Sequence, residues 1–180
     1  MKIILFSHIA KTLLIVAVLF NVSSDTVYAD ANSSTQLLVT TCLKPISDLA
    51  QVDRIAQEKR WKKNTSVART KDQSTFKSRS IWNVTHDGEE YVVTTATDKS
   101  NDGKLMNVCM VIFNNASVRG ADFQTRLSEL LKLKMLAETK FSNANMFVYE
   151  VENGQPPRVL LQLMTNADGN TIQAAIMAVR

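Results

Sequence analysis

Residues 105–113 read LMNVCMVIF, an almost continuously apolar run that is rich in Val and Ile. A strand with one face in water alternates apolar and polar residues, whereas a strand covered on both faces is apolar nearly throughout. We therefore expect residues 105–113 to form a central strand of a sheet, with both of its faces covered.

Strand-like segments continue on the N-terminal side of this run. Residues 76–85 contain several large apolar side chains, and residues 91–97 have the β-branched sequence YVVTTAT. Asp87-Gly88 separates these two segments, and Asp102-Gly103 precedes the central run. Asp-Gly is favoured where a hairpin turn needs positive φ angles. The three segments together predict an antiparallel meander.

Two segments have the apolar spacing of helices, residues 43–61 and residues 121–138. Pro45 suits the first turn of the first helix, where its missing N–H costs nothing. Asp122 is of a type that caps the start of the second helix. Residues 30–35 are polar and predict a loose leader ahead of the first helix.

Three more strands are expected at residues 146–151, 158–165 and Thr171–Val179. The order α-β-β-β-α-β-β-β predicts an α+β fold, an antiparallel sheet of about six strands with two packed helices. Gly88 and Gly103 stand 15 positions apart, as do Gly154 and Gly169. This spacing indicates an internal duplication, although two unrelated meanders with strands of similar length would also produce it.

The first 29 residues have the three regions of a cleavable secretory signal peptide. Lys2 and Lys11 supply positive charge, residues 12–20 (TLLIVAVLF) are apolar, and a polar segment ends at Val27-Tyr28-Ala29. We expect cleavage after Ala29 or, two residues later, after Ala31.

An uncleaved membrane anchor is the alternative interpretation of this N-terminus. A spanning helix needs about 20 continuous apolar residues, and Lys11 interrupts the run. We therefore expect an exported protein, periplasmic or secreted, with no stable membrane insertion after cleavage. The short leader and the few cysteines favour a bacterial source.

Removing 29 of the 180 residues leaves 151, and residues 30–180 are expected to form a single α+β domain. Both cysteines, Cys42 and Cys109, lie in this part. An even number of cysteines in an exported protein favours a disulfide, which would pin the first helix to the sheet. Two buried thiols that never pair are the alternative.

Basic residues are concentrated in one part of the chain. Residues 54–79 contain nine Lys and Arg against two acidic residues, and residues 62–74 or so predict an exposed basic linker. Such a run can meet an anionic partner, here an envelope protein or an anionic surface polymer; nucleic acid is not expected outside the cell. The contact residues would be Lys59, Arg60, Trp61, Lys62, Lys63, Arg69 and Lys71. A solvated, charged linker is the alternative.

The residue patterns of catalytic and metal sites are missing from the sequence. The only histidine after the leader, His86, falls in a predicted turn, and both cysteines are expected to be oxidised. We therefore predict no nucleophilic triad and no zinc site. Asp98, Ser100 and Asp102 match the opening of a calcium loop, but Cys109 stands where the closing glutamate belongs. No phosphate-binding loop is present, and no cofactor is expected.

Paired carboxylates remain as hydrolase candidates, namely Glu89 with Glu90 and Glu150 with Glu152, but both pairs stand beside predicted turns. We therefore expect no identifiable catalytic residue and a non-enzymatic binding or interaction module of the cell envelope or secreted space. The alternative is a hydrolase-type enzyme whose carboxylates the sequence does not reveal, and a purely structural exported domain is a third. A deep cleft that gathers Glu90, Glu150 and Glu152 would favour the enzyme.

Overall fold

The computed structural model of the protein describes residues 31–64, 78–99, 103–114, 120–152, 157–169 and 171–179. The predicted signal peptide and residues 65–74 of the predicted basic linker lie outside the described residues.

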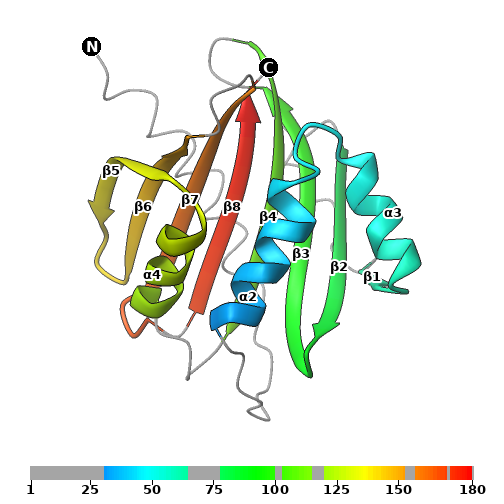
Figure 1. The fold of residues 1–180 in the computed structure, drawn as a ribbon, viewed down its shortest axis with the longest axis horizontal. Coiled ribbons are helices and arrows are strands. Elements are labelled where there is room, and N and C mark those ends of the chain that lie inside the picture. Colours follow the sequence, from blue (N-terminus) through cyan, green and yellow to red (C-terminus); the bar gives the residue numbers. More distant parts are fainter. Residues whose placement is uncertain are drawn as a thin grey trace.

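The described residues form one antiparallel sheet of eight strands in the order β1-β2-β3-β4-β8-β7-β6-β5. Each half of the chain contributes a four-stranded meander, and the two meanders meet where β4 pairs with β8 (Figure 1). Counted from either edge, four strands therefore follow in chain order: β1 to β4 from one edge and β5 to β8 from the other. The strands are β1 Lys62–Lys63, β2 Ser78–His86, β3 Glu89–Lys99, β4 Leu105–Asn114, β5 Leu133–Lys140, β6 Ala144–Val151, β7 Arg158–Asn166 and β8 Thr171–Val179.

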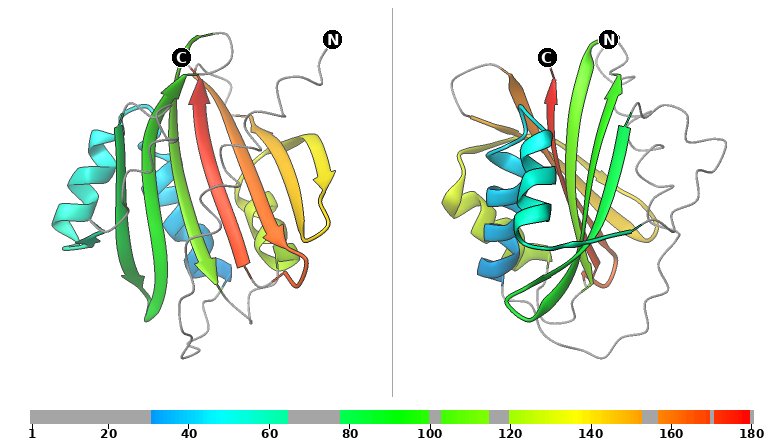
Figure 2. Two further views of the ribbon diagram at one scale, coloured as in Figure 1. Left: turned by 180° about the vertical axis from the view of Figure 1, so that it is seen from behind. Right: turned by 90° about the vertical axis from the view of Figure 1, so that its right-hand side faces the viewer.

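The described residues include three α-helices, α2 (Ala31–Leu38), α3 (Ala50–Glu58) and α4 (Gly120–Leu130), which lie on the same face of the sheet (Figures 1 and 2). Their apolar sides form one core with the strands, and the largest fully buried side chain there is Phe123 of α4. Phe123 packs edge-on against Phe113 of β4 at 5.2 Å between ring centroids. This core holds the helices against the sheet.

The prediction of an α+β fold with an antiparallel sheet is confirmed, and so is the central position of residues 105–113. In β4 the neighbouring residues Met110 and Val111 point to opposite faces, and both are almost fully buried. The Asp87-Gly88 turn is also confirmed, because both residues have positive φ angles, 52° and 85°. Such a two-residue turn matches the twist of the flanking strands.

The expected number of about six strands and two helices is wrong in detail. The helix predicted over residues 121–138 ends at Leu130, and Leu133–Lys140 form the edge strand β5. The sequence LKMLAETK consists mostly of good helix formers, but its backbone pairs with β6 along most of its length. Tertiary pairing outweighs local propensity here. The other unpredicted strand, β1, has only two residues.

The N-terminal helical region also differs from the prediction. Residues expected to be a loose polar leader form α2, and Ser33, Ser34 and Thr35 in its first turns are buried. Their hydroxyls have partners that the sequence pattern does not reveal, such as the Tyr91 hydroxyl for Ser34. The helix expected from residue 43 instead begins at Ala50, after a break that contains Pro45.

The disulfide between Cys42 and Cys109 is confirmed, with the two Cα atoms 5.2 Å apart. Cys42 belongs to a π-helical turn, η2 (Val39–Leu43), that continues α2, and the N–H of Lys44 donates to Val39 O. Cys109 lies on β4, one of the two central strands. Both cysteines are fully buried, so the bond joins the helical layer to the middle of the sheet.

Candidate functional site

The candidate site is a short basic turn, residues 59–63, that joins α3 to β1. Lys59 and Arg60 follow the last residue of α3, while Lys62 and Lys63 form β1 at the edge of the sheet. All four cationic residues are exposed, and Trp61 between them is half-buried. The structure therefore adds the conformation and the exposure of these residues to the sequence prediction.

The backbone of the basic turn is held by two hydrogen bonds that close the end of α3. The N–H of Trp61 donates to Ala56 O at 2.8 Å, and the N–H of Arg60 donates to Gln57 O at 3.1 Å. Together they make a Schellman motif, in which the residue after the C-cap adopts a left-handed conformation. That residue is Arg60, with φ of 55°. Glycine is the usual occupant of this position because a Cβ strains it.

Three further contacts fix the basic turn to the domain. The Trp61 side chain packs against the main core, and Lys62 and Lys63 pair with Asn83 and Trp82 of β2. The N–H of Asn64 then donates to Ile81 O at 2.8 Å. Residues 62–63 are thus an edge strand and not an unstructured linker.

The charges of the basic turn are not neutralised within the part of the chain that the structure describes. The ion pairs there are Arg54–Asp48, His86–Asp87, Arg126–Glu129, Lys140–Glu138 and Arg158–Glu150. None involves a residue of the basic turn. Four neighbouring cations without a described acidic partner produce a local positive potential that an anionic partner can meet.

The tryptophans contribute less to this surface than the sequence suggests. Trp82 is 4% exposed and belongs to the core, so it is not available to a partner. Trp61 is partly buried and presents only part of its ring. The remaining two predicted contact residues, Arg69 and Lys71, lie outside the described residues.

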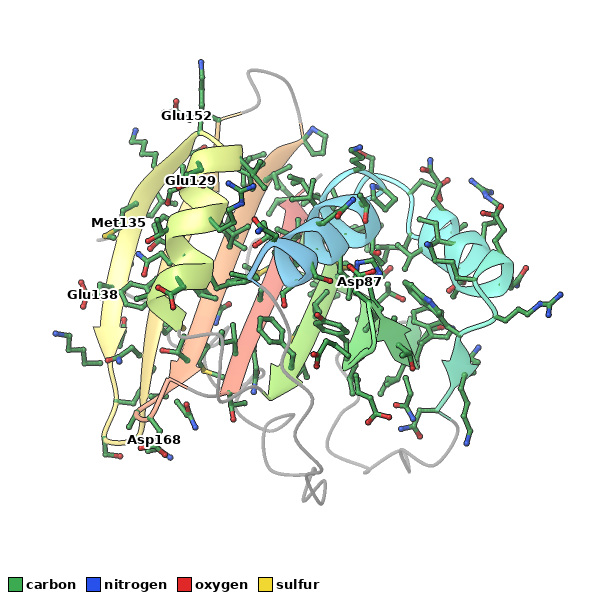
Figure 3. The ribbon with its side chains drawn as sticks, turned by 60° about the horizontal axis from the view of Figure 1, so that its bottom comes forward. Asp87, Glu129, Met135, Glu138, Glu152 and Asp168 are labelled. Atoms are coloured by element: carbon green, nitrogen blue, oxygen red, sulfur yellow. A yellow bond between two sulfur atoms is a disulfide. The ribbon has the colours of Figure 1, made fainter. Side chains whose placement is uncertain are left out.

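The carboxylates considered for hydrolysis do not converge. Glu90 lies on β3 and Glu150 on β6, with β4, β8 and β7 between them; four strand spacings amount to about 19 Å. Arg158 donates to Glu150 at 2.8 Å, and this hydrogen bond lowers the pKa of the Glu150 carboxyl. Figure 3 shows Glu152 on the β5–β6 side of the molecule. The deep cleft that would favour an enzyme is therefore not formed by these three residues.

A polar cluster that sequence reasoning missed joins the start of α2 to the β2–β3 hairpin. Ser33 Oγ donates to Asp87 Oδ2 at 2.7 Å, and the hydroxyls of Ser34 and Tyr91 are 3.2 Å apart. Asp87 lies beside α2 in Figure 3. Ser33 and Asp87 are 54 residues apart in sequence, and no local pattern brings them together.

The same cluster contains His86, but its geometry is not that of a catalytic triad. His86 Nε2 lies 3.6 Å from Asp87 Oδ2 and has no hydrogen-bond partner among the described residues. In a triad the serine donates to the histidine, whereas Ser33 donates to the aspartate. Burial raises the pKa of Glu89, the cross-strand neighbour of His86, and that of Tyr91. The cluster ties a helix to a hairpin.

The calcium loop considered from the sequence finds no support in the described residues. The carboxylate of Asp98 accepts a hydrogen bond from the N–H of Lys99, and Ser100 and Asp102 lie outside the described part. Where side chains are described, no three His, Cys, Asp or Glu residues are grouped so that they could hold a metal ion.

Among the described residues, no helix is both long and apolar enough to cross a bilayer. Comparison with known proteins adds no functional assignment, because no family model, no curated protein and no solved structure matches this chain.

Proposed function

We propose that the chain is an exported, non-enzymatic binding module that contacts a polyanionic surface through the basic turn. The observation that carries the proposal is the left-handed conformation of Arg60. A side chain costs about 1–2 kcal/mol in this conformation, and glycine would avoid that cost. An arginine held there at the expense of stability suggests selection for its charge. A cation at this position also interacts favourably with the negative end of the helix dipole.

The form of the surface supports the same function. Lys59 and Arg60 lie at the end of α3, whereas Lys62 and Lys63 occupy cross-strand positions on β1. Because Trp61 is anchored in the core, the four charges are presented by an ordered backbone. Ordering before binding reduces the conformational entropy lost on association. Phosphate groups of an envelope polymer or of lipid headgroups share the chemistry that such a surface recognises.

Export, to the periplasm or the secreted space of a bacterium, is the second part of the proposal. Its support is the three-region N-terminus together with the buried disulfide. Structural disulfides persist in oxidising compartments and are rare in the cytosol of most organisms. We also infer that the two halves derive from an internal duplication. The symmetric strand order, with β4 and β8 at the junction, supports it.

The test is binding to phosphatidylglycerol vesicles, with phosphatidylcholine vesicles as the neutral reference. The triple variant Lys59→Gln, Lys62→Gln, Lys63→Gln removes three charges from the basic turn. Each basic residue near an anionic membrane contributes about 1 kcal/mol, so the variant should bind about 100-fold more weakly. Raising the salt concentration should weaken wild-type binding as well.

The matched control is Lys132→Gln, Lys134→Gln, Lys140→Gln, three exposed lysines on or next to β5 at the opposite edge of the sheet. It changes the net charge equally and should keep most of the binding. Equal losses in the two variants would reduce the effect to net charge and refute a specific surface. Binding to soluble polyphosphate but not to vesicles would identify a polymer as the partner.

A further inference from the structure

Ala31 distinguishes the two signal-peptide cleavage sites that the sequence leaves open. It is the first residue that the structure describes, and it already lies in α2. Cleavage after Ala29 leaves every described residue of the helix in the mature chain. Cleavage after Ala31 would remove one of them.

Ala31 belongs to the folded domain. Its side chain is partly buried against the main core, and its carbonyl oxygen accepts a hydrogen bond of 2.6 Å from Thr35 Oγ1. The Thr35 side chain is fully buried, so the loss of this acceptor would leave a buried hydroxyl without a partner. An unpaired buried hydroxyl is costly.

The residues that follow Ala31 are equally integral. Ser34 is 0% exposed and contacts the hydroxyl of Tyr91, and Ser33 donates to Asp87 of the hairpin. A chain that began at Asn32 would carry its α-ammonium group directly beside these buried hydroxyls. A positive charge at a helix N-terminus is also unfavourable to the helix dipole.

Asp30 gives an independent reason from the sequence. It directly precedes Ala31 in the sequence, and an acidic residue near the N-terminal end of a helix is favourable to the helix dipole. Its carboxylate would also offset the new α-ammonium charge. We therefore expect both Asp30 and Ala31 to be retained in the mature domain.

We propose that the mature protein begins at Asp30, through hydrolysis of the Ala29–Asp30 peptide bond by a membrane-bound signal peptidase. Water adds across this bond, which leaves a carboxylate on Ala29 of the released leader and an α-ammonium group on Asp30. The small side chain of Ala29 and the residue pattern Val27-Tyr28-Ala29 fit such an enzyme. This inference rests on the proposed export of the chain.

The test expresses the full 180-residue chain in a bacterium and measures the intact mass of the exported form after reduction. We expect the mass of residues 30–180. A product lighter by one Asp and one Ala residue, beginning at Asn32, would overturn the inference and leave export intact. A full-length chain that stays in the cytoplasm would overturn export itself, and the proposed cleavage with it.

A second measurement tests whether residues 30–31 stabilise the folded domain. In a full-length variant that lacks residues 30–31, cleavage after Ala29 yields a chain that begins at Asn32. Its melting temperature should fall by about 2–8 °C, the shift that the loss of the Ala31 packing and one buried hydrogen bond produces in a domain of this size. The control Asp30→Asn keeps Ala31 and its carbonyl acceptor and should melt close to the wild type. An unchanged melting temperature in the deletion variant would refute the assigned role of residues 30–31.

Discussion

The backbone N–H of Trp61 donates to the carbonyl oxygen of Ala56 at 2.8 Å, and this bond closes α3 just before the chain enters the sheet. The residue between the helix end and Trp61 that must turn left-handed is Arg60, with φ of 55°. The position that displays the basic charge is therefore also a position of backbone strain. This coincidence is the observation on which the proposed contact with an anionic partner rests.

Arg60→Gly should stabilise the fold while weakening binding to anionic vesicles. Glycine relieves the left-handed strain, and after its greater freedom in the unfolded chain is subtracted, a gain of about 0.5–1 kcal/mol is expected. Urea denaturation measures the free energy of unfolding. The control Gln57→Gly, inside α3, should lose about 1 kcal/mol. A destabilised Arg60→Gly protein would show that the arginine is kept for folding and not for contact.

The Ser33–Asp87 hydrogen bond should appear as a coupling between the two residues in a double-mutant cycle. Ser33→Ala removes the donor, and Asp87→Gly removes the acceptor while tolerating the positive φ of this turn position. We expect a coupling energy of about 0.5–1.5 kcal/mol. The control pairs Ser33→Ala with Asp168→Gly, in the β7–β8 turn, and should be additive. Additivity in both cycles would mean that the bond does not anchor α2.

The central strands could be predicted from the sequence because their composition depends on burial alone. Val108 to Val111 are apolar on both faces, and this property does not depend on which strand is the neighbour. The strand β5 could not be predicted in this way. Its residues favour a helix locally, and only pairing with β6, whose register is set by the whole second meander, decides its structure.

Helix α2 and the candidate site could likewise be predicted from the sequence only in part. Ser33, Ser34 and Thr35 are polar types that usually lie in water, and their burial depends on partners such as Tyr91 that are distant in sequence. The charges of the basic turn are visible in the sequence. The left-handed conformation of Arg60 is not, because it requires the contact of the following tryptophan with the core.

Stability should depend on pH through Glu89, whose pKa is raised by burial. The folded protein then binds the Glu89 proton more tightly than the unfolded chain does. The Glu89 contribution to the free energy of unfolding is therefore fully present below the unfolded pKa. It is lost as the pH rises through the folded pKa. Glu89→Gln should accordingly be more stable than the wild type at neutral pH, and this advantage should disappear in acid.

Urea denaturation at pH 3.5 and pH 7.5, about one unit below and about three units above the ordinary glutamate pKa, measures this difference. Glu90→Gln removes the same charge from the exposed neighbour of Glu89 and reports the effect of net charge alone. An identical pH dependence in the two variants would show that burial of Glu89 has no energetic consequence.

Removing the disulfide should destabilise the domain strongly. Cys42 and Cys109 are 67 positions apart, and cross-linking a loop of this length stabilises a fold by about 4 kcal/mol through the unfolded state. The variant Cys42→Ala, Cys109→Ala should show this loss in urea, and wild-type protein kept in reductant should approach it. The two measurements separate the cross-link from the packing of the sulfur atoms. A loss below about 1 kcal/mol in both would mean that the helical layer is held by the core alone.

Gly120→Ala should destabilise the junction between α4 and β7. A Cβ at this position would clash with Cγ2 of Thr165 and lie 3.2 Å from its Cβ. Thr165 is 6% exposed and lies on a strand with neighbours on both sides, so it can yield little, and overpacking of this kind costs about 1–3 kcal/mol. Adding Thr165→Ser removes the nearer methyl group and should restore part of the loss. If Thr165→Ser instead destabilises the Gly120→Ala protein further, the contact with Thr165 is not the reason that glycine is required at the start of α4.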